Sequence, residues 1–150
     1  MRTPALERAL RSVPRQAFLP APFALAIDDL ATEIAETDDP RRLYTDVMVV
    51  LLRAPSVLCS APSVVAAQIE RLAPGDGMRV LHIGTGSGYC TALLAELVGE
   101  RGTVVGVEHD PEVEQLGAAL LAQAGYTTVT VRAGDGALGV PEAAPFDRIS

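Results

Sequence analysis

Glycines gather directly after a short apolar segment. Residues 80–83 are Val-Leu-His-Ile, and Gly84-Thr85-Gly86-Ser87-Gly88 follow at once. Glycine has no Cβ and tolerates positive φ, so such a run lets the backbone turn sharply and approach a ligand closely. At the carboxyl end of a buried strand, the run predicts a loop that binds a nucleotide-like cofactor through Gly84, Thr85, Gly86 and Gly88.

A carboxylate ends the next expected strand. Glu108 follows a β-branched run and lies 24 residues after Gly84. At that place a carboxylate can accept hydrogen bonds from both hydroxyls of a ribose, as it does in dinucleotide-binding folds. We therefore expect Glu108 to bind the cofactor. The alternative is a plain glycine turn beside a solvated strand end.

A third candidate follows the third expected strand. In Gly134-Asp135-Gly136 the aspartate can accept a hydrogen bond from an adenine amino group. Taken alone, this combination is more typical of a turn. Its position at the carboxyl end of another strand favours binding, and we assign Asp135 and Gly136 to the cofactor site.

The glycine spacing separates two cofactor classes. The dinucleotide fingerprint Gly-x-Gly-x-x-Gly requires glycine at position 89, where this chain has Tyr89. Gly-x-Gly-x-Gly resembles the pattern of S-adenosylmethionine-dependent methyltransferases instead. S-adenosylmethionine is the expected cofactor, and nucleotide-dependent oxidoreduction is a distant alternative.

Alternating strands and helices must position these groups. The pattern predicts strands over 79–83, 103–108 and 127–132 and from 146 onward, with helices over 89–98 and 111–124. Such alternation predicts a parallel sheet with right-handed crossovers, that is, a doubly wound α/β domain of the Rossmann-like type. We assign residues 63–150 to this cofactor-binding domain, incomplete at its carboxyl end.

The leading part of the chain has a different character. All 13 glycines lie between Gly75 and Gly139. Helical spacing of apolar residues predicts helices over 3–13 and 62–72 and allows another over 28–36, whereas 40–52 fits either a helix or a strand. We therefore expect residues 1–62 to form a mainly helical segment that ends in a substrate loop.

Composition excludes several classes of protein. The 12 basic and 19 acidic residues give a net charge of −7, which argues against a nucleic-acid partner. Stretches without charge are too short to span a bilayer, so we expect a cytoplasmic protein without a membrane segment. Cys59 and Cys90 match neither a disulfide framework nor a metal site, and we interpret both as packing residues. The oligomeric state stays open.

Several ordered blocks resemble the protein-L-isoaspartate O-methyltransferase family over most of the chain. They are Val13-Pro14-Arg15 with Phe18 and Pro20, Tyr44 with Asp46, Ser60 with Pro62, residues 83–89, Glu108, Gly134-Asp135-Gly136, and Pro145-Phe146-Asp147-Arg148-Ile149. The resemblance implies methyl transfer from S-adenosylmethionine to the free carboxylate of an isoaspartyl residue in a protein or peptide, the first step of protein repair.

The implied chemistry requires little acid–base assistance. A carboxyl group with a pKa near 4 is already ionised at neutral pH, so the nucleophile needs no general base. Alignment and exclusion of water then supply much of the acceleration. By analogy with the family, Ser60 is the catalytic residue that orients the incoming carboxylate. The alternative is that Ser60 caps the helix that follows.

Departures from the family pattern keep other functions open. Leu58 and Ala61 replace a threonine and a glutamine around Ser60, and His82 replaces an acidic residue. We interpret His82 as a buried histidine with a satisfied hydrogen bond. The altered loop allows a second function, methylation of an aspartate in a biosynthetic peptide. A third is an inactive remnant that binds cofactor weakly or not at all.

The resemblance also implies that the later strands of the sheet are absent. The family fold has seven strands, and Ser150 falls a few residues into the fourth. A chain cut short there would expose a sheet edge and apolar surface. We therefore expect low stability for the isolated chain.

Overall fold

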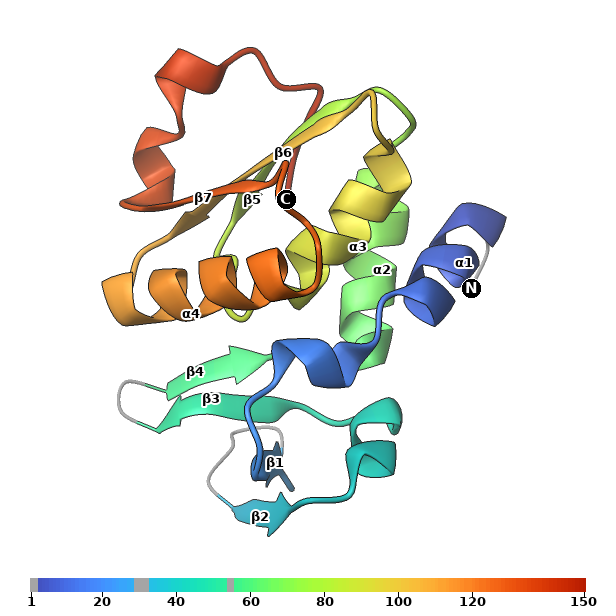
Figure 1. Ribbon diagram of the computed structural model, residues 1–150, viewed down its shortest axis with the longest axis vertical. Coiled ribbons are helices and arrows are strands. Elements are labelled where there is room, and N and C mark those ends of the chain that lie inside the picture. Colours follow the sequence, from blue (N-terminus) through green and yellow to red (C-terminus); the bar gives the residue numbers. More distant parts are fainter. Residues whose placement is uncertain (1–2, 29–32, 54–55) are drawn as a thin grey trace.

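The computed structural model describes residues 3–28, 33–53 and 56–150, and this part of the chain forms two four-stranded sheets (Figure 1). The first sheet is antiparallel with the order β2-β1-β3-β4, and the second is parallel with the order β7-β6-β5-β8. The strands of the first sheet are β1 (Phe23–Ala26), β2 (Ile34–Thr37), β3 (Val49–Arg53) and β4 (Ser56–Cys59).

The parallel sheet confirms the predicted α/β class. Its strands are β5 (Arg79–Ile83), β6 (Thr103–Glu108), β7 (Thr130–Ala133) and β8 (Arg148–Ile149), and the helices α3 (Tyr89–Val98) and α4 (Pro111–Gln123) connect the first three strands. β5 lies centrally, with Ile83 paired to Val107 of β6 and Leu81 paired to Ile149 of β8. Because the strands are parallel, the segments that follow β5, β6 and β7 meet at one edge of the sheet.

The sheet edge beyond β8 is exposed in the described structure. β8 pairs with β5 alone among the described strands, and Ile149 is 61% exposed. The low stability expected from such surface stays a prediction.

The antiparallel sheet corrects the expectation for the leading segment. Residues 34–36, part of the stretch 28–36 for which a helix was allowed, belong to β2 and pair with β1; residues 29–32 of that stretch lie outside the described part. The backbone groups of β1 need a partner, and this pairing outweighs the weak helical spacing. The ambiguous stretch 40–52 divides into a 3₁₀ turn, η2 (Pro40–Tyr44), and β3. The predicted first helix is present as α1 (Pro4–Ser12).

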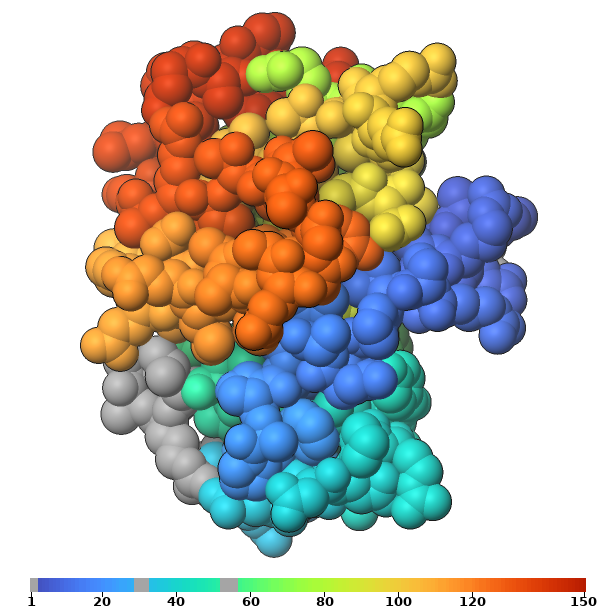
Figure 2. Space-filling view, in the orientation of Figure 1, coloured from blue at the N-terminus to red at the C-terminus, as the bar shows by residue number. Residues whose placement is uncertain are grey.

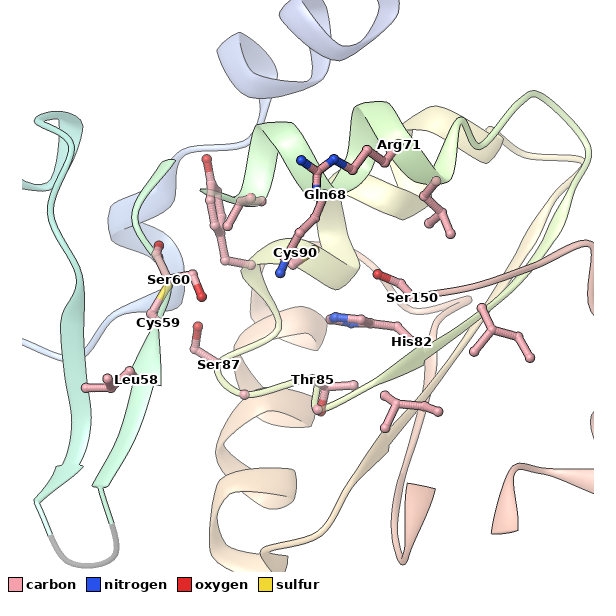
Figure 3. A pocket seen from close by; sticks show the side chains of 17 residues that line it. Leu58, Cys59, Ser60, Gln68, Arg71, His82, Thr85, Ser87, Cys90 and Ser150 are labelled. Atoms are coloured by element: carbon pink, nitrogen blue, oxygen red, sulfur yellow. The ribbon is translucent and has the colours of Figure 1, made fainter. Parts of the chain in front are cut away.

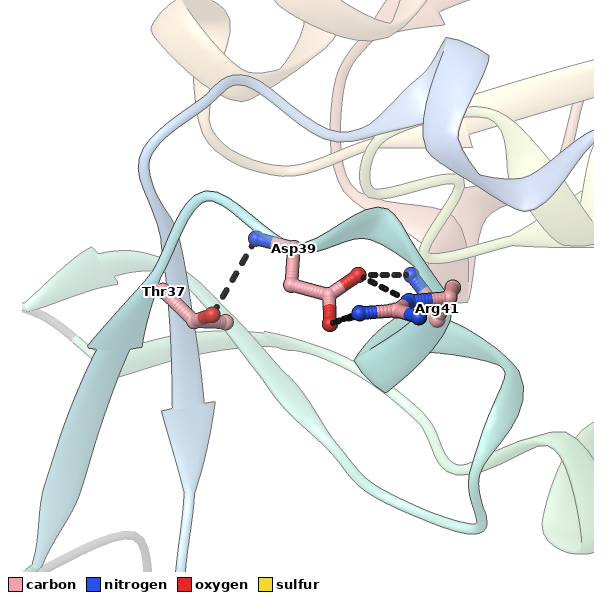
Figure 4. Close-up of polar contacts among 3 residues, drawn as sticks. All are labelled: Thr37, Asp39 and Arg41. Carbon is pink, nitrogen blue, oxygen red and sulfur yellow. Dashed lines mark hydrogen bonds and ion pairs between the residues drawn. The ribbon is translucent and has the colours of Figure 1, made fainter.

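A carboxylate holds the connection between β2 and η2. Asp39 caps η2 by accepting hydrogen bonds from the backbone N–H of Arg41 at 3.0 Å and from its Nη2 at 2.8 Å (Figure 4). Its own N–H donates to the Thr37 hydroxyl at 3.1 Å. The hydrogen bonds from Arg41 lower the pKa of Asp39.

The core runs without interruption from the leading segment to the parallel sheet. α1 lies beside α3 and beside α2 (Pro62–Leu72), and the 3₁₀ turn η1 (Arg15–Phe18) packs against α4 (Figure 1). In the space-filling view, the blue N-terminal segment accordingly lies directly against the orange atoms of α4 (Figure 2). One cluster of buried residues includes Leu6, Phe18, Val49, Ile69 and Leu93. A domain boundary at residue 62 stays a prediction.

Two glycines let backbone and side chains approach the predicted cofactor loop. A Cβ on Gly117 of α4 would lie 2.4 Å from the carbonyl oxygen of Gly86, and a Cβ on Gly106 of β6 would lie 2.4 Å from Cγ2 of Thr85. Both distances are far below contact distance. α4 therefore packs directly on the glycine loop, and Thr85 packs directly on β6.

The close packing at Gly117 predicts that Gly117→Ala changes the free energy of unfolding in the direction opposite to that expected from helix propensity. In an open helix, Gly→Ala stabilises by about 1 kcal/mol. Gly117→Ala should instead lower the free energy of unfolding by about 1–3 kcal/mol, because the added methyl group overpacks the Gly86 carbonyl. Urea titration followed by circular dichroism measures the change. The matched control is Ala119→Gly on the exposed face of α4, with an expected loss of about 1 kcal/mol. A more stable Gly117→Ala protein would contradict the packing.

Candidate functional site

The glycine loop crosses from β5 to α3 over the end of β6. The N–H of Gly84 donates to the carbonyl of Val107 at 2.8 Å, and the N–H of Gly88 donates to the carbonyl of Thr85 at 3.0 Å. Gly84, Gly86 and Gly88 have φ values of 79°, 55° and 88°, which side chains rarely allow. The three glycines are therefore required by the path of the loop.

Glu108 lies against this loop, as the sequence predicts. Its Oε2 accepts a hydrogen bond from the N–H of Gly86 at 2.9 Å, and its Oε1 accepts from the N–H groups of His109 at 2.8 Å and Asp110 at 3.3 Å. The side chain is largely buried. A carboxylate has about four lone-pair directions. Three are used here, so this arrangement leaves capacity for one further donor.

The third motif meets the same edge of the sheet. The N–H of Gly134 donates to the carbonyl of Glu108 at 2.8 Å, and a Cβ on Gly136 would lie 2.3 Å from Cγ2 of Ile83. Asp135 is exposed and caps the short 3₁₀ turn η3 (Gly136–Leu138), with Oδ1 accepting from the N–H of Ala137 at 2.9 Å. Its turn-forming role is thus present, and its Oδ2 accepts no hydrogen bond from the part of the chain that the structure describes.

A cavity of about 550 Å³ lies between the glycine loop, α2 and residues 58–60. Among the predicted site residues, Ser60, Gly84, Thr85 and Gly86 line it, whereas Gly88, Glu108, Asp135 and Gly136 do not. Figure 3 shows Ser60 and Ser87 on facing walls, with Gln68 and Arg71 extending from α2. The predicted residues therefore form two adjoining regions, one along the sheet edge and one inside the cavity.

Sequence reasoning missed part of the cavity wall. Gln68 and Arg71 line it from α2, and Ser87 lines it from within the glycine loop. The spacing of three between Gln68 and Arg71 places both on one helix face. That signal was present in the sequence, but nothing in it showed which face meets the loop.

Thr85 carries a hydroxyl oxygen that is buried and lacks a hydrogen-bond partner among the described residues. The residue is 3% exposed and lines the cavity. An unsatisfied buried hydroxyl is costly. A polar ligand beside the loop would satisfy it.

The structure contradicts the capping alternative for Ser60. α2 begins at Pro62 with Ala61 as its N-cap, and no side chain of that N-cap accepts a hydrogen bond. Asp46 serves instead, because its Oδ1 accepts from the N–H of Ser63 at 2.9 Å. That hydrogen bond, together with a weaker effect of the Arg15 charge, lowers the pKa of Asp46. The Ser60 side chain is left to line the cavity.

His82 is a buried neutral histidine, as interpreted from the sequence. Its Nδ1 lies 2.9 Å from the Thr91 hydroxyl, and the residue is 6% exposed. Burial lowers the pKa of His82 to about 4, against a weaker opposing effect of the Glu108 charge. At neutral pH the ring adds no charge to the cavity that it lines.

Both cysteines behave as packing residues. Cys59 is buried and Cys90 partly so, and both thiols are free. Burial raises the pKa of the Cys90 thiol to about 12, so it stays protonated and unreactive at neutral pH. Within residues 3–28, 33–53 and 56–150, no cluster of potential metal ligands occurs, and no helix there is long and apolar enough to cross a bilayer.

The depressed pKa of His82 predicts acid sensitivity. Below pH 6.5 the unfolded chain binds a proton at His82, whereas the folded chain binds it only near pH 4. Protonation therefore favours unfolding, and stability falls as the pH drops through this window. Relative to His82→Gln, the wild-type protein should lose about 3 kcal/mol between pH 7 and pH 4. Urea titrations at four pH values measure this; equal pH profiles for the two proteins would disprove it.

Comparisons with known proteins agree with this geometry. The family model described as protein-L-isoaspartate(D-aspartate) O-methyltransferase matches residues 1–150. The chain is 40% identical over 142 residues to a protein-L-isoaspartate O-methyltransferase of Methanococcoides burtonii, covering 95% of this chain and 61% of the relative. A 90-residue match to protein-L-isoaspartate O-methyltransferase 1 of Archaeoglobus fulgidus reaches 49% identity and covers 60% of this chain and 42% of that relative.

Solved structures share the fold. A protein-L-isoaspartate O-methyltransferase superposes with a TM-score of 0.82 at 30% identity, covering 98% of this chain and 42% of the other. A Plasmodium falciparum protein described as a putative member of the same enzyme class superposes with a TM-score of 0.74 at 18% identity, covering 99% and 65%. The chain spans about half the length of the curated relatives it matches. Because the family model matches residues 1–150, the chain belongs to the protein-L-isoaspartate(D-aspartate) O-methyltransferase family.

Proposed function

We propose that this chain binds S-adenosylmethionine and directs its methyl group to the free carboxylate of an isoaspartyl residue in a protein or peptide. One observation carries the proposal: the Glu108 carboxylate accepts a hydrogen bond from the N–H of Gly86 at 2.9 Å, and Gly86 lines the same cavity as Ser60. The carboxylate proposed to bind the ribose, the glycine loop and the proposed substrate cavity are thus next to one another. Membership of the family supports the same reaction.

The residues at the sheet edge fit such a cofactor. Glu108 has capacity for one ribose hydroxyl, and the orphaned Thr85 hydroxyl needs a polar partner. Asp135 offers a carboxylate oxygen to an adenine amino group, and Gly136 lets this turn pack closely on Ile83. Gly84, Gly86 and Gly88 complete the proposed set. When bound, the cofactor supplies a methyl group on a sulfonium.

Methyl transfer to the substrate carboxylate requires orientation and exclusion of water more than proton transfer. An isoaspartyl carboxylate is ionised at neutral pH. The nearby His82 is a weak base because burial lowers its pKa to about 4, and the Cys90 thiol stays protonated because burial raises its pKa to about 12. Neither side chain is suited to accept a proton. We assign to the Ser60 hydroxyl the donation of a hydrogen bond to the incoming carboxylate, which holds one oxygen toward the methyl donor.

Leu58 favours a second candidate substrate. The residue lines the cavity where the family pattern has threonine, so a polar contact to the substrate is replaced by an apolar one. An aspartate side chain in a biosynthetic peptide would meet the same Ser60 hydroxyl with different neighbours. We also infer a cytoplasmic protein without nucleic-acid or membrane partners, in line with the net charge of −7.

Glu108→Gln tests the cofactor site. The substitution removes the charge and turns one acceptor oxygen into a donor, so the affinity for S-adenosylmethionine should fall about tenfold or more. Isothermal titration calorimetry measures it. Glu100→Gln, at an exposed position after α3, is the charge-matched control and should bind like wild type. Equal affinities for all three proteins would remove the ribose assignment.

Transfer of labelled methyl to three peptides of otherwise identical sequence tests the substrate. The isoaspartyl peptide should be methylated, and the aspartyl and asparaginyl peptides should not. Ser60→Ala should lower kcat/KM by about 10- to 100-fold, because the carboxylate loses its orienting donor. Ser12→Ala, at the end of α1, is the control.

The other outcomes identify the alternatives. Transfer to the aspartyl peptide alone would establish the second candidate. Cofactor binding without transfer to any peptide would indicate a non-catalytic protein.

A further inference from the structure

Arg15 is a charged residue in the middle of the core. It begins η1 and is 1% exposed. Its Nη1 donates to the carbonyl of Leu43 at 2.6 Å, and its Nη2 donates to the carbonyls of Val47 at 3.0 Å and Ser60 at 2.9 Å. A buried guanidinium is retained only with compensating contacts. Here those contacts are the three backbone carbonyls and the Cys59 sulfur, 3.8 Å from Nη2, whereas Nε has no hydrogen-bond partner among the described residues.

The three carbonyls come from parts of the chain that are separate in sequence. Leu43 belongs to η2, Val47 precedes β3, and Ser60 links β4 to α2. The planar guanidinium presents its donors in a fixed fork, so it sets the relative positions of all three segments. Arg15 therefore acts as a cross-link at the base of the Ser60 loop.

The same guanidinium reaches the glycine loop's end. Its Cζ lies 5.9 Å from the ring centroid of Tyr89, the residue that follows Gly88 and begins α3. Burial raises the pKa of Tyr89 to about 12, so the ring stays a neutral phenol, and a cation over its face is attracted. Arg15 thus contacts both walls of the cavity, the Ser60 side through a carbonyl and the glycine-loop side through a ring.

The backbone around Ser60 is held on its other flanks as well. Cys59 pairs with Val49 in the antiparallel sheet, and the N–H of Ser63 is held by Asp46. Between these two points, the described hydrogen bond from Arg15 to the Ser60 carbonyl restrains the one residue whose hydroxyl meets the substrate. Rotation of that peptide group would move the hydroxyl.

We infer that Arg15 is a positioning residue for methyl transfer: by holding the Ser60 carbonyl and the Tyr89 ring together, it sets the Ser60 hydroxyl at a fixed place relative to the glycine loop. Arg15 is not among the residues that line the cavity, and it acts through Ser60. The kinetic part of this inference rests on the proposed function, whereas the restraint of the loop does not.

Two substitutions of Arg15 separate charge from geometry. Arg15→Lys keeps the charge and loses the fork, and Arg15→Met keeps the approximate volume and loses both. Each should lower kcat/KM for the isoaspartyl peptide by about 10- to 100-fold, while the dissociation constant for S-adenosylmethionine changes less than about threefold, since Glu108 and the glycines are untouched. Arg15→Lys serves if Arg15→Met fails to fold. Leu6→Ala, buried in α1, is the control for general destabilisation and should keep both values.

A double-mutant cycle with Ser60→Ala tests whether Arg15 acts through Ser60. In the Ser60→Ala background, Arg15→Lys should lower kcat/KM less than about twofold further, because the hydroxyl that it positions is already gone. Losses that multiply would show a general structural role and overturn the inference.

Hydrogen–deuterium exchange tests the restraint without any activity. In Arg15→Lys, amides of residues 57–61 should exchange about tenfold faster, whereas those of residues 84–88 should keep the wild-type rate. An unchanged rate in residues 57–61 would overturn the inference. If wild-type protein methylates no peptide, the proposed function fails, and exchange alone decides whether Arg15 holds the loop.

Discussion

The hydrogen bond between the Glu108 carboxylate and the N–H of Gly86 joins the ends of two neighbouring strands. Parallel pairing brings β5 and β6 to the same edge, and this contact then fixes the loop that leaves β5 against the acid that ends β6. The cavity wall formed by Thr85 and Ser87 follows from that placement. Without the acid, the loop would lose the hydrogen bond that holds Gly86 over the end of β6.

Local signals in the sequence were sufficient for this edge and for little else. The apolar strand before Gly84 and the helix after Gly88 follow from short-range patterns, so both the fold class and the loop could be predicted. β2 could not, because its strand conformation depends on pairing with β1, a separate segment of the chain. The alternative that Ser60 caps α2 was wrong because the capping group is distant in sequence: Asp46 reaches Ser63 from 17 positions away.

Burial explains why several polar residues near the site do not exchange protons at neutral pH. His82 and Cys90 lie beside the cavity, yet desolvation keeps both neutral at pH 7. The Arg15 guanidinium lies among carbonyl oxygens and beside an aromatic ring. Such an arrangement suits a reaction whose nucleophile arrives already ionised, since hydrogen bonding and position, rather than proton exchange, are what the walls supply.

The contact between Gly117 and the Gly86 carbonyl has a consequence for ligand affinity. A loop that lies against a helix backbone on one side and a strand carboxylate on the other has few alternative shapes to lose when a ligand arrives. Most of the conformational entropy of the loop is therefore lost during folding, so ligand binding carries a smaller entropic cost.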